Sequence, residues 1–523
     1  MELGTRQFVG PPEVRRVAII RPRFRPIPLL MLVQDAGLAD PRTIAQYEPV
    51  IGLEVHVQLK TRTKIFSHST HEFGKSPNTQ TDPVVLGLPG ALPVLNREAV
   101  ALAVRASMAI NCRVNRYSQF ARKNYFYPDL PKGYQISQYD RPLAEHGWLD
   151  IRVENDSKRI GITRLHMEED AGKTIHDGFG DSNRYSYVDL NRAGAPLCEI
   201  VSEPDLRSAD EAVAYLNELK LIIQFAGASD CDMEKGQLRC DANVSVRRTG
   251  AEKFGTRCEI KNLNSFRFVK QAIQYEIARQ VAVVEDGGSI VQETRLFNTA
   301  SGTTVSMRGK EDSHDYRYFP EPDLPPLVLS DEQLASVREE MPELPPAMRA
   351  RFVSDYGLSD YDARVLTLTV ASAHYFEQAA EASGNPKATA NWVQGELMGT
   401  LNASAKDIAD SPVSPSRLGE LIQLIDNGTL SGKLAKQVFA KMFETGRSAG
   451  EVIESEGLRQ ISDSDQLEGV IHDILSRSEK QVAQYRGGKA GVLGYFVGQV
   501  MKVTRGQANP ILVNQLLRKA LDG

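Results

Sequence analysis

Two short segments in the first half of the chain carry side chains that could together bind a divalent cation. The first contains Glu54 and His56, within residues 53–59, where apolar and polar side chains alternate. An alternation with a period of two predicts a strand that presents the carboxylate and the imidazole on one face. Polar residues on the solvent side of a strand are also common without any function, so a purely structural role is the alternative.

The second segment is strongly acidic and reads His-Met-Glu-Glu-Asp over residues 166–170. Because three adjacent carboxylates repel one another and β-structure disfavours them, we expect them at a strand end or turn where positive charge lies nearby. Carboxylate oxygens are the ligands that Mg²⁺ prefers, and Mg²⁺ organises phosphate chemistry. The segment therefore predicts metal binding, with a solvated acidic turn as the alternative.

Glu199 is a third candidate, because it lies in the largely apolar stretch of residues 196–201. An ionised carboxylate in such surroundings is costly unless it has a partner, which could be a metal ion or a basic side chain. A salt bridge to a residue such as Arg192 is the competing structural explanation.

Residues 121–134 combine basic side chains with four aromatic ones. This mixture suits contact with a nucleotide or with the end of an RNA chain, where bases stack on rings and phosphates meet lysine or arginine. Packing within a rigid, proline-containing loop is the alternative.

The overall composition is that of a globular enzyme with several domains. A chain of 523 residues exceeds what one hydrophobic core normally organises, so we expect two to four domains. The net charge of -5 argues against a protein whose whole surface is basic and binds nucleic acid without specificity. The 5 cysteines include no CxxC pair, which indicates a reducing compartment and no disulfide framework. No stretch approaches the roughly 20 apolar residues of a membrane span.

The sequence pattern changes from strands to helices near residue 330. Before this point, short runs of alternating apolar and polar residues are separated by glycine and proline. Two of these runs, residues 238–246 and 257–261, predict a hairpin with one solvent-exposed face. Helical periodicity interrupts the strands over residues 97–110, 209–226 and 268–284. We therefore predict an α+β fold, in which a large mixed, mainly antiparallel sheet is followed by all-α domains.

Several common catalytic motifs are missing from the sequence. There is no GxxxxGK[ST] phosphate loop, no HExxH motif and no Rossmann glycine fingerprint. If ATP is used, a less common kind of site must hold it. Nor is there a glycine- and serine-rich amidase segment or a clear Cys/His nucleophile pair, so the chain lacks the machinery for releasing ammonia from an amide.

Ordered blocks of sequence match a known family from about Tyr47 to the C-terminus. The blocks are residues 50–59, 86–96, 121–133, 189–204, 233–241, 259–266, 315–320 and 498–501. They resemble the B subunits of the bacterial-type aspartyl/glutamyl-tRNA amidotransferases. The arginine-rich residues 1–46 fall outside the resemblance, and we interpret them as a disordered or wrongly assigned extension. The resemblance implies a cradle-like sheet domain at residues 47–328, a helical domain at 329–410 and a helical tail domain at 411–523.

The resemblance also implies a reaction and its partners. In the family, the side-chain carboxylate of Glu mischarged on tRNA(Gln), or of Asp on tRNA(Asn), is phosphorylated with ATP and Mg²⁺, and ammonia then displaces phosphate. The ammonia comes through a channel from an amidase subunit (A), and a small subunit (C) completes the heterotrimer. No membrane partner is implied, and a cytoplasmic location is expected. The alternative is a non-catalytic tRNA-binding scaffold subunit whose acidic cluster has only a structural role.

Site residues follow from the matching positions. The resemblance assigns the metal site to Glu54, His56, Glu169 and Glu199, and it assigns Lys123 and Glu169 to the catalytic gate where ammonia enters. Arg257 and Lys261, on the wet face of the predicted hairpin, are candidates for contacts with the phosphates of the nucleotide. The basic C-terminal segment is expected to contact the tRNA body through phosphates.

One set of positions departs from the family. Some members carry zinc-binding cysteines where this chain has Ser67, Ser69, Asp82 and Val85. Without thiolates we expect no structural zinc, so ordinary packing must hold this segment.

Overall fold

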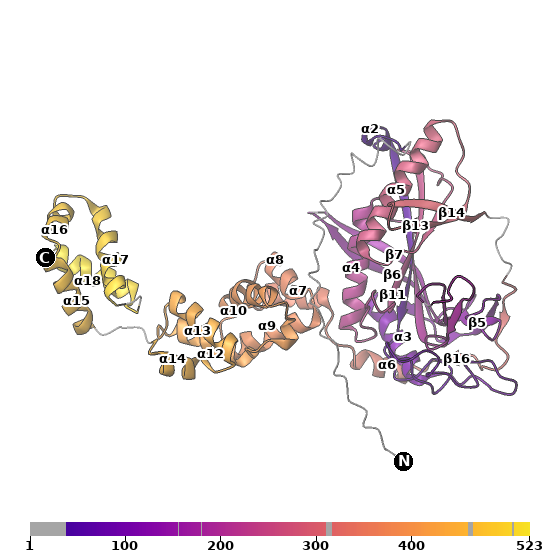
Figure 1. Cartoon of the computed structure of the whole chain (residues 1–523), viewed down its shortest axis with the longest axis horizontal. Coiled ribbons are helices and arrows are strands. Elements are labelled where there is room, and N and C mark those ends of the chain that lie inside the picture. The colour runs from indigo at the N-terminus through magenta and orange to yellow at the C-terminus, as the bar shows by residue number, and fades with distance from the viewer. Residues whose placement is uncertain are drawn as a thin grey trace, which may run out of the picture.

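Figure 1 shows three folded parts in a row, namely a large sheet part, a helical part and a smaller C-terminal helical part. The computed structural model describes residues 38–154, 156–178, 180–309, 316–458, 464–504 and 507–522. Residues 1–37, which make up most of the predicted N-terminal extension, lie outside the described residues. The first described element is the short helix α2 (Pro41–Ile44).

A twelve-stranded sheet forms the framework of the first part. Its main path runs β14-β13-β12-β11-β1-β10-β7-β5-β4-β15, and β6 pairs with both β7 and β2. The pairings are antiparallel, except that β12 and β13 are parallel. The bounds are β1 (Tyr47–Gln58), β2 (Arg113–Val114), β4 (Phe120–Asn124), β5 (Tyr134–Gln138), β6 (Ala144–Val153), β7 (Asp156–Glu169), β10 (Pro196–Ser202), β11 (Leu238–Arg248), β12 (Cys258–Lys261), β13 (Glu293–Asn298), β14 (Thr303–Gly309) and β15 (Phe319–Pro320).

Two smaller pairs of strands lie outside this sheet. They join β3 (Tyr117–Ser118) to β16 (Leu327–Val328) and β8 (Lys173–Ile175) to β9 (Tyr187–Asp189). The predicted hairpin is confirmed, because β11 and β12 pair in antiparallel fashion.

The two faces of the large sheet differ in chemistry because side chains alternate along each strand. On β1 the odd-numbered residues from 53 to 57 are buried in the main hydrophobic core, whereas Glu54, His56 and Gln58 belong to the opposite face. Helices α3 (Arg97–Ala109), α4 (Ala209–Phe225) and α5 (Phe266–Glu285) contribute apolar residues to that core, and Figure 1 shows α4 and α5 along the sheet. The opposite face is therefore left to carry polar side chains.

Local sequence explains where these helices begin. Asn96, Ser208 and Ser265 each precede a helix, and each side chain accepts a hydrogen bond from a backbone N–H of the first turn. Such caps satisfy donors that have no partner within the helix. All three helices lie at the predicted places within a few residues.

A second hydrophobic core organises the helical part. Its helices are α7 (Pro345–Ser354), α8 (Asp360–Leu366), α9 (Val370–Ser383), α10 (Pro386–Trp392), α11 (Met398–Ala403), α12 (Pro415–Asp426), α13 (Gly432–Thr445) and α14 (Ala449–Glu456), while α6 (Asp331–Glu339) packs against the first core. Leu221 and Phe225 of α4 also join this second core, which ties the helices to the sheet part. Helices from both sides of the predicted boundary at residues 410 and 411 share one core, and the division into domains stays a prediction.

A third core unites α15 (Ser464–Ser476), α16 (Glu479–Arg486), α17 (Leu493–Val503) and α18 (Pro510–Asp522). Helix α18 begins as predicted, because the side chain of Asn509 accepts hydrogen bonds from the N–H groups of Ile511 and Leu512 at 2.9 and 3.2 Å. The predicted α+β class, with a mainly antiparallel sheet followed by helices, is confirmed. Among the described residues, no helix is both long and apolar enough to cross a membrane.

Candidate active site

Strand register brings three of the candidate residues into one line across the sheet. Strand β10 lies between β1 and β7, and the register sets His56 opposite Glu199 and Glu199 opposite His166. Directly opposed residues project from the same face, so all three side chains belong to the polar face. Residues 54 and 168, each two places along its strand from a member of this line, belong to that face as well.

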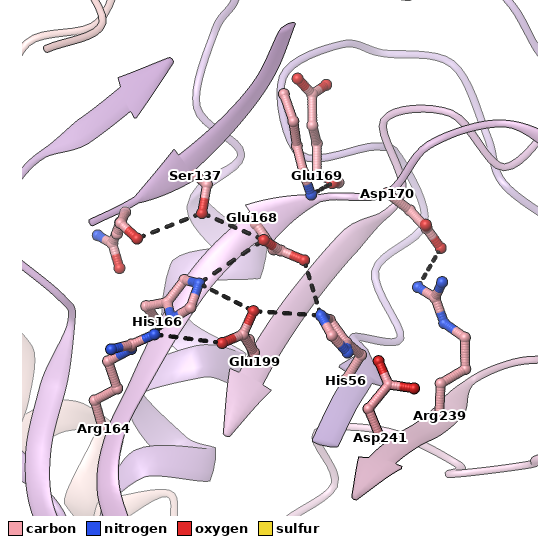
Figure 2. A network of polar contacts seen from close by, with 12 residues as sticks. His56, Ser137, Arg164, His166, Glu168, Glu169, Asp170, Glu199, Arg239 and Asp241 are labelled. Carbon is pink, nitrogen blue, oxygen red and sulfur yellow. Dashed lines mark hydrogen bonds and ion pairs between the residues drawn. The ribbon is translucent and has the colours of Figure 1, made fainter. Parts of the chain in front are cut away.

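Two carboxylates and two imidazoles form a closed acid–histidine cluster, made of His56, His166, Glu168 and Glu199 (Figure 2). The Nε2 atom of His56 lies 3.2 Å from Glu168 and 3.4 Å from Glu199. The Nε2 atom of His166 lies 3.6 Å from Glu199 and 3.8 Å from Glu168. Both carboxylates are buried, with exposed fractions of 3% for Glu168 and 6% for Glu199. Their charges therefore act on one another with little screening by water.

The cluster shifts the pKa values of its members in opposite directions. Burial opposes the charged form of His56, but hydrogen bonds with Glu168 and Glu199 outweigh it and raise the pKa of His56 to about 10. Burial also opposes ionisation of Glu168, yet hydrogen bonds from His166 and His56 hold its pKa well below the usual range. The pKa of Glu199 is lowered despite burial, because His166 lies near it and His56 donates a hydrogen bond to it. Both carboxylates are therefore ionised at neutral pH.

Two neighbours orient the cluster. Arg164 donates a hydrogen bond from Nε to Nδ1 of His166 at 3.3 Å, so the proton of this imidazole lies on Nε2, which faces the two carboxylates. The hydroxyl of Ser137 donates to Glu168 at 3.2 Å. Arg164 also lies 3.6 Å from Glu199 and is its basic partner, whereas the predicted alternative, Arg192, lies beside Asp170.

The donor atoms beside His56 suit a divalent cation. Those of Glu54, His56 and Glu199 lie within 4.8 Å of one another, as do those of His166, Glu168 and Glu199. Burial and the nearby charge of Glu199 raise the pKa of Glu54, which has no ion pair or hydrogen bond within the described part of the chain. A carboxylate that faces other acids and makes no hydrogen bond or ion pair among the described residues fits a site for Mg²⁺. Nε2 of His56 and Nε2 of His166 both carry a proton that faces the carboxylates, so either imidazole must lose this proton before it can bind a cation.

Glu169 lies apart from the acid–histidine cluster, although sequence resemblance placed it in the metal site. As the neighbour of Glu168 at the end of β7, it points to the other side of the strand. Its carboxylate pairs with Lys132 and accepts a hydrogen bond from the backbone N–H of Ile136 at 2.8 Å. The predicted pair of Lys123 with Glu169 is therefore replaced by a pair of Lys132 with Glu169. Glu168 is the acid that sequence reasoning missed, and the period of two from His166 was the available signal.

Comparison with known proteins identifies the family of this chain. The family model described as "GatB/GatE catalytic domain" matches residues 49–335, and the model described as "GatB domain" matches residues 374–521. A curated relative from Geotalea daltonii, named as the B subunit of an aspartyl/glutamyl-tRNA(Asn/Gln) amidotransferase, is 59% identical over 481 residues, which cover 91% of this chain and 100% of the relative. The protein of the same name from Syntrophotalea carbinolica is 57% identical over 92% of this chain and 99% of its own length. The chain belongs to the GatB family.

The catalytic-domain match of this GatB-family chain contains the whole acid–histidine cluster. Lys123 shares the polar face, because β4 pairs with β5 and Ser137 of β5 lies opposite Glu168. Its ammonium lies 4.9 Å from the centre of the Tyr316 ring. Burial opposes the charge of Lys123, but Glu168 and Glu199 raise its pKa, so it stays charged at neutral pH.

The two residues predicted to contact the nucleotide lie further along the sheet of this GatB-family chain. Lys261 is on β12, and its ammonium lies 2.8 Å from Asp241 and 2.9 Å from Glu259. These two acids outweigh burial and raise the pKa of Lys261. Arg257 is exposed directly before β12, and the described contacts do not join it to the acid–histidine cluster.

The segment in which some GatB-family members carry zinc-binding cysteines is held here by hydrogen bonds to Asp82. Its carboxylate accepts from the hydroxyl of Ser69 and from the backbone N–H of Val85, both at 2.9 Å. These contacts agree with a segment that ordinary polar packing stabilises, and the expected absence of zinc stays a prediction.

Proposed function

We propose that the chain is the subunit of an ATP-dependent tRNA amidotransferase that converts Glu-tRNA(Gln), Asp-tRNA(Asn) or both into their amidated forms. Relatives that match over almost their full length carry the name of this subunit. The acid–histidine cluster, buried on the polar face beside Glu54, is the observation that supports catalysis. A scaffold would have no need to keep two ionised carboxylates out of water.

The proposed reaction has two steps, because a carboxylate is a poor electrophile. In the first, a side-chain carboxylate oxygen of the mischarged amino acid attacks the γ-phosphorus of ATP, and ADP leaves. In the second, ammonia attacks the acyl carbon, the bond between this carbon and the phosphate oxygen breaks, and the proton lost by nitrogen leaves on inorganic phosphate. Mg²⁺, when held by Glu54, His56 and Glu199, supplies positive charge to the transferring phosphoryl group.

Residues around the cluster protect the acyl phosphate from water. Lys123 lies against Tyr316 on the side where β4 and β5 border the cluster. Next to it, the rings of Tyr139 and Tyr318 stack with centroids 4.0 Å apart. This wall of rings and one half-buried ammonium suits a gate that admits ammonia and excludes bulk water. An amidase subunit would supply the ammonia, and a small third subunit would complete a cytoplasmic heterotrimer.

Tests of ATP consumption separate catalysis from a scaffold role. The reconstituted heterotrimer is incubated with Glu-tRNA(Gln), an ammonium salt and ATP labelled on its γ-phosphate. We expect release of labelled phosphate that requires the mischarged tRNA, with uncharged tRNA(Gln) as the control. Amidation without any tRNA-dependent consumption of ATP would contradict the proposal, and tRNA binding without amidation would favour a scaffold.

Replacement of Lys123 tests the proposed gate. We expect Lys123→Met to lower glutamine-dependent amidation by roughly 100-fold, because a residue that transfers protons and excludes water is lost. Amidation from added ammonium salt should fall much less, since that ammonia does not need the channel. Lys158→Met is the matched control, because Lys158 pairs with Glu211 at 2.8 Å away from the cluster. Equal losses with both nitrogen sources would argue against a gate at Lys123.

Deletion of the C-terminal helices tests tRNA contact by the tail. The cut belongs before α15, because Leu467 and Ile471 of this helix lie in the third hydrophobic core with α17 and α18. Removal of residues 464–523 should weaken binding of tRNA by roughly tenfold and lower its salt dependence, because basic side chains are lost. Filter binding at two salt concentrations measures both effects. An unchanged affinity would contradict tRNA contact, and gel filtration reports whether the partners still assemble.

A further inference from the structure

A short segment, residues 316–323, carries two rings of the proposed gate. Its one regular element is β15, which pairs with β4 and sets Phe319 opposite Arg122. Side chains alternate along both strands, so Tyr318 shares the face of Lys123, whereas Arg122 belongs to the other face of β4. The segment can therefore be held from one face of the strand while it presents its rings on the other.

Arg122 holds this segment through a carboxylate that is shut off from water. The Nε atom of Arg122 donates to one oxygen of Glu321 at 2.7 Å, and Nη2 donates to the other oxygen at 2.9 Å. Nη2 also donates to Asp323 at 2.9 Å. Glu321 is the one buried residue of the segment, with an exposed fraction of 2%. Loss of Arg122 would leave this buried charge without its basic partner.

Further contacts fix both the arginine and the other end of the segment. The guanidinium of Arg122 lies 4.2 Å from the centre of the Tyr134 ring on β5, which limits its movement. Two residues along β4 on the same face, the side chain of Asn124 donates to the backbone oxygens of Tyr316 and Arg317 at 3.2 and 2.9 Å. Polar contacts with β4 thus hold the segment at both of its ends.

The rings of the segment depend on this attachment for their position. Tyr316 and Tyr318 lie with ring centres 6.1 Å apart, next to the ammonium of Lys123 and the ring of Tyr139. Between the two tyrosines, Arg317 has a φ of 45°, a left-handed conformation that is unfavourable for a residue with a side chain. The chain would not keep this shape without contacts that enforce it.

We propose that Arg122 is a positioning residue for amidation, because it fixes residues 316–323 on β4 and so keeps their two tyrosine rings against Lys123. It acts from the opposite face of the strand and through these rings. The inference rests on the proposed function, since it concerns the wall that protects the acyl phosphate. It also gives a role to one basic residue of the segment 121–134, for which the sequence left nucleotide contact and loop packing open.

The number of ATP molecules cleaved per amide formed tests this role. The reconstituted heterotrimer is given Glu-tRNA(Gln), glutamine and ATP labelled on its γ-phosphate, and labelled phosphate and Gln-tRNA(Gln) are measured in the same sample. The proposed reaction uses one ATP for each amide. We expect Arg122→Met to raise this ratio roughly fivefold, because displaced rings no longer keep water from the acyl phosphate.

The extra ATP is consumed by hydrolysis of the acyl phosphate. Water attacks the acyl carbon, and the bond between this carbon and the phosphate oxygen breaks. The free carboxylate is restored, one proton of the water leaves on inorganic phosphate and the other goes to the solvent. A merely structural role of Arg122 would lower ATP cleavage and amidation together and leave their ratio unchanged. The KM for ATP should also stay near the wild-type value.

Two arginine variants serve as controls. Arg122→Lys keeps one charged contact with Glu321 and should give a ratio between those of the wild type and Arg122→Met. Arg159→Met removes an arginine with the same kinds of contact elsewhere on the sheet. Arg159 donates to both oxygens of Asp150 at 2.9 and 3.0 Å and lies 3.6 Å from the centre of the Trp148 ring. This variant should keep the wild-type ratio.

Tyr318→Leu shows whether Arg122 acts through the rings. This variant should raise the ratio by itself, and it leaves the ion pairs of Arg122 in place. Addition of Arg122→Met to Tyr318→Leu should raise the ratio much less than Arg122→Met does alone, because the two changes remove the same barrier. If the effects of the two changes multiply in full, Arg122 does not act through the ring and the proposal is overturned. Arg122→Lys and Tyr318→Leu carry the same test if Arg122→Met fails to assemble.

Failure of this inference differs from failure of the proposed function. If the wild-type complex consumes one ATP per amide and the Arg122 variants do the same, the positioning role is wrong and the proposed function stands. If the wild-type complex consumes no ATP with the mischarged tRNA, the proposed function itself fails, and the role of Arg122 fails with it.

Discussion

Glu199→Gln is expected to lower the rate of tRNA-dependent ATP cleavage by roughly 10³-fold, or about 4 kcal/mol of transition-state stabilisation. Glu199 is the one side chain shared by both groups of potential metal ligands among the described residues. It also lies 3.4 Å from His56 and 3.6 Å from His166. The amide removes a negative charge at the centre of the cluster while it keeps the size of the side chain. A lower rate therefore reflects the missing charge and not a change in packing.

Single-turnover formation of ADP, at saturating ATP and mischarged tRNA, measures this loss. Glu203→Gln is the matched control, because Glu203 is exposed and its carboxylate accepts a hydrogen bond from Thr163 at 2.8 Å. The control should react at nearly the wild-type rate. Wild-type turnover in Glu199→Gln would remove the cluster from the chemistry.

A matched pair of variants, Glu168→Gln and Glu169→Gln, is expected to separate two adjacent acids by their effects on metal binding. We expect Glu168→Gln to weaken binding of Mn²⁺, as a probe for Mg²⁺, by roughly 100-fold. Glu168 lies 3.2 Å from His56 and belongs to the cluster, so its charge acts directly on the proposed cation. Glu169→Gln should bind Mn²⁺ much as the wild type does, because its carboxylate is paired with Lys132 away from the cluster.

Electron paramagnetic resonance of free Mn²⁺ measures both affinities without any need for turnover. Thermal unfolding of the metal-free variants shows whether Glu169→Gln destabilises the fold through the loss of its partner Lys132. If Glu169→Gln loses the metal and Glu168→Gln keeps it, the position implied by sequence resemblance is right, and the choice made from the strand face is wrong.

Much of the fold could be predicted because its signals are local. Alternation along β1 and helical periodicity at α3, α4 and α5 depend only on neighbouring residues, and the structure confirms them. Three members of the proposed site, Glu54, His56 and Glu199, were also identified before any geometry was known. Glu199 could be singled out because an acid among apolar residues needs a partner wherever the chain folds.

The expected contacts that differ from the structure are those that depend on long-range pairing. Lys132 lies 37 residues from Glu169 in sequence and yet forms its ion pair, which displaces the predicted partner Lys123. Arg192 likewise lies near Glu199 in sequence but pairs with Asp170. The residues next to Glu169 and Glu199 in sequence do not indicate which basic side chain pairs with each acid, because several basic residues could reach either acid in an unfolded chain.

The sequence by itself determined which residues share a face of each strand and the order of the strands and helices. It also determined which carboxylate and imidazole side chains are present. Only the tertiary structure decided that β10 lies between β1 and β7, which places His56, Glu199 and His166 in one line. It also decided that Arg239 of β11 lies directly opposite His56 of β1. The physical reason is that strand register depends on the whole buried face of the sheet and not on the polar residues themselves. The proposed metal site on that face is thus positioned by apolar side chains on the other.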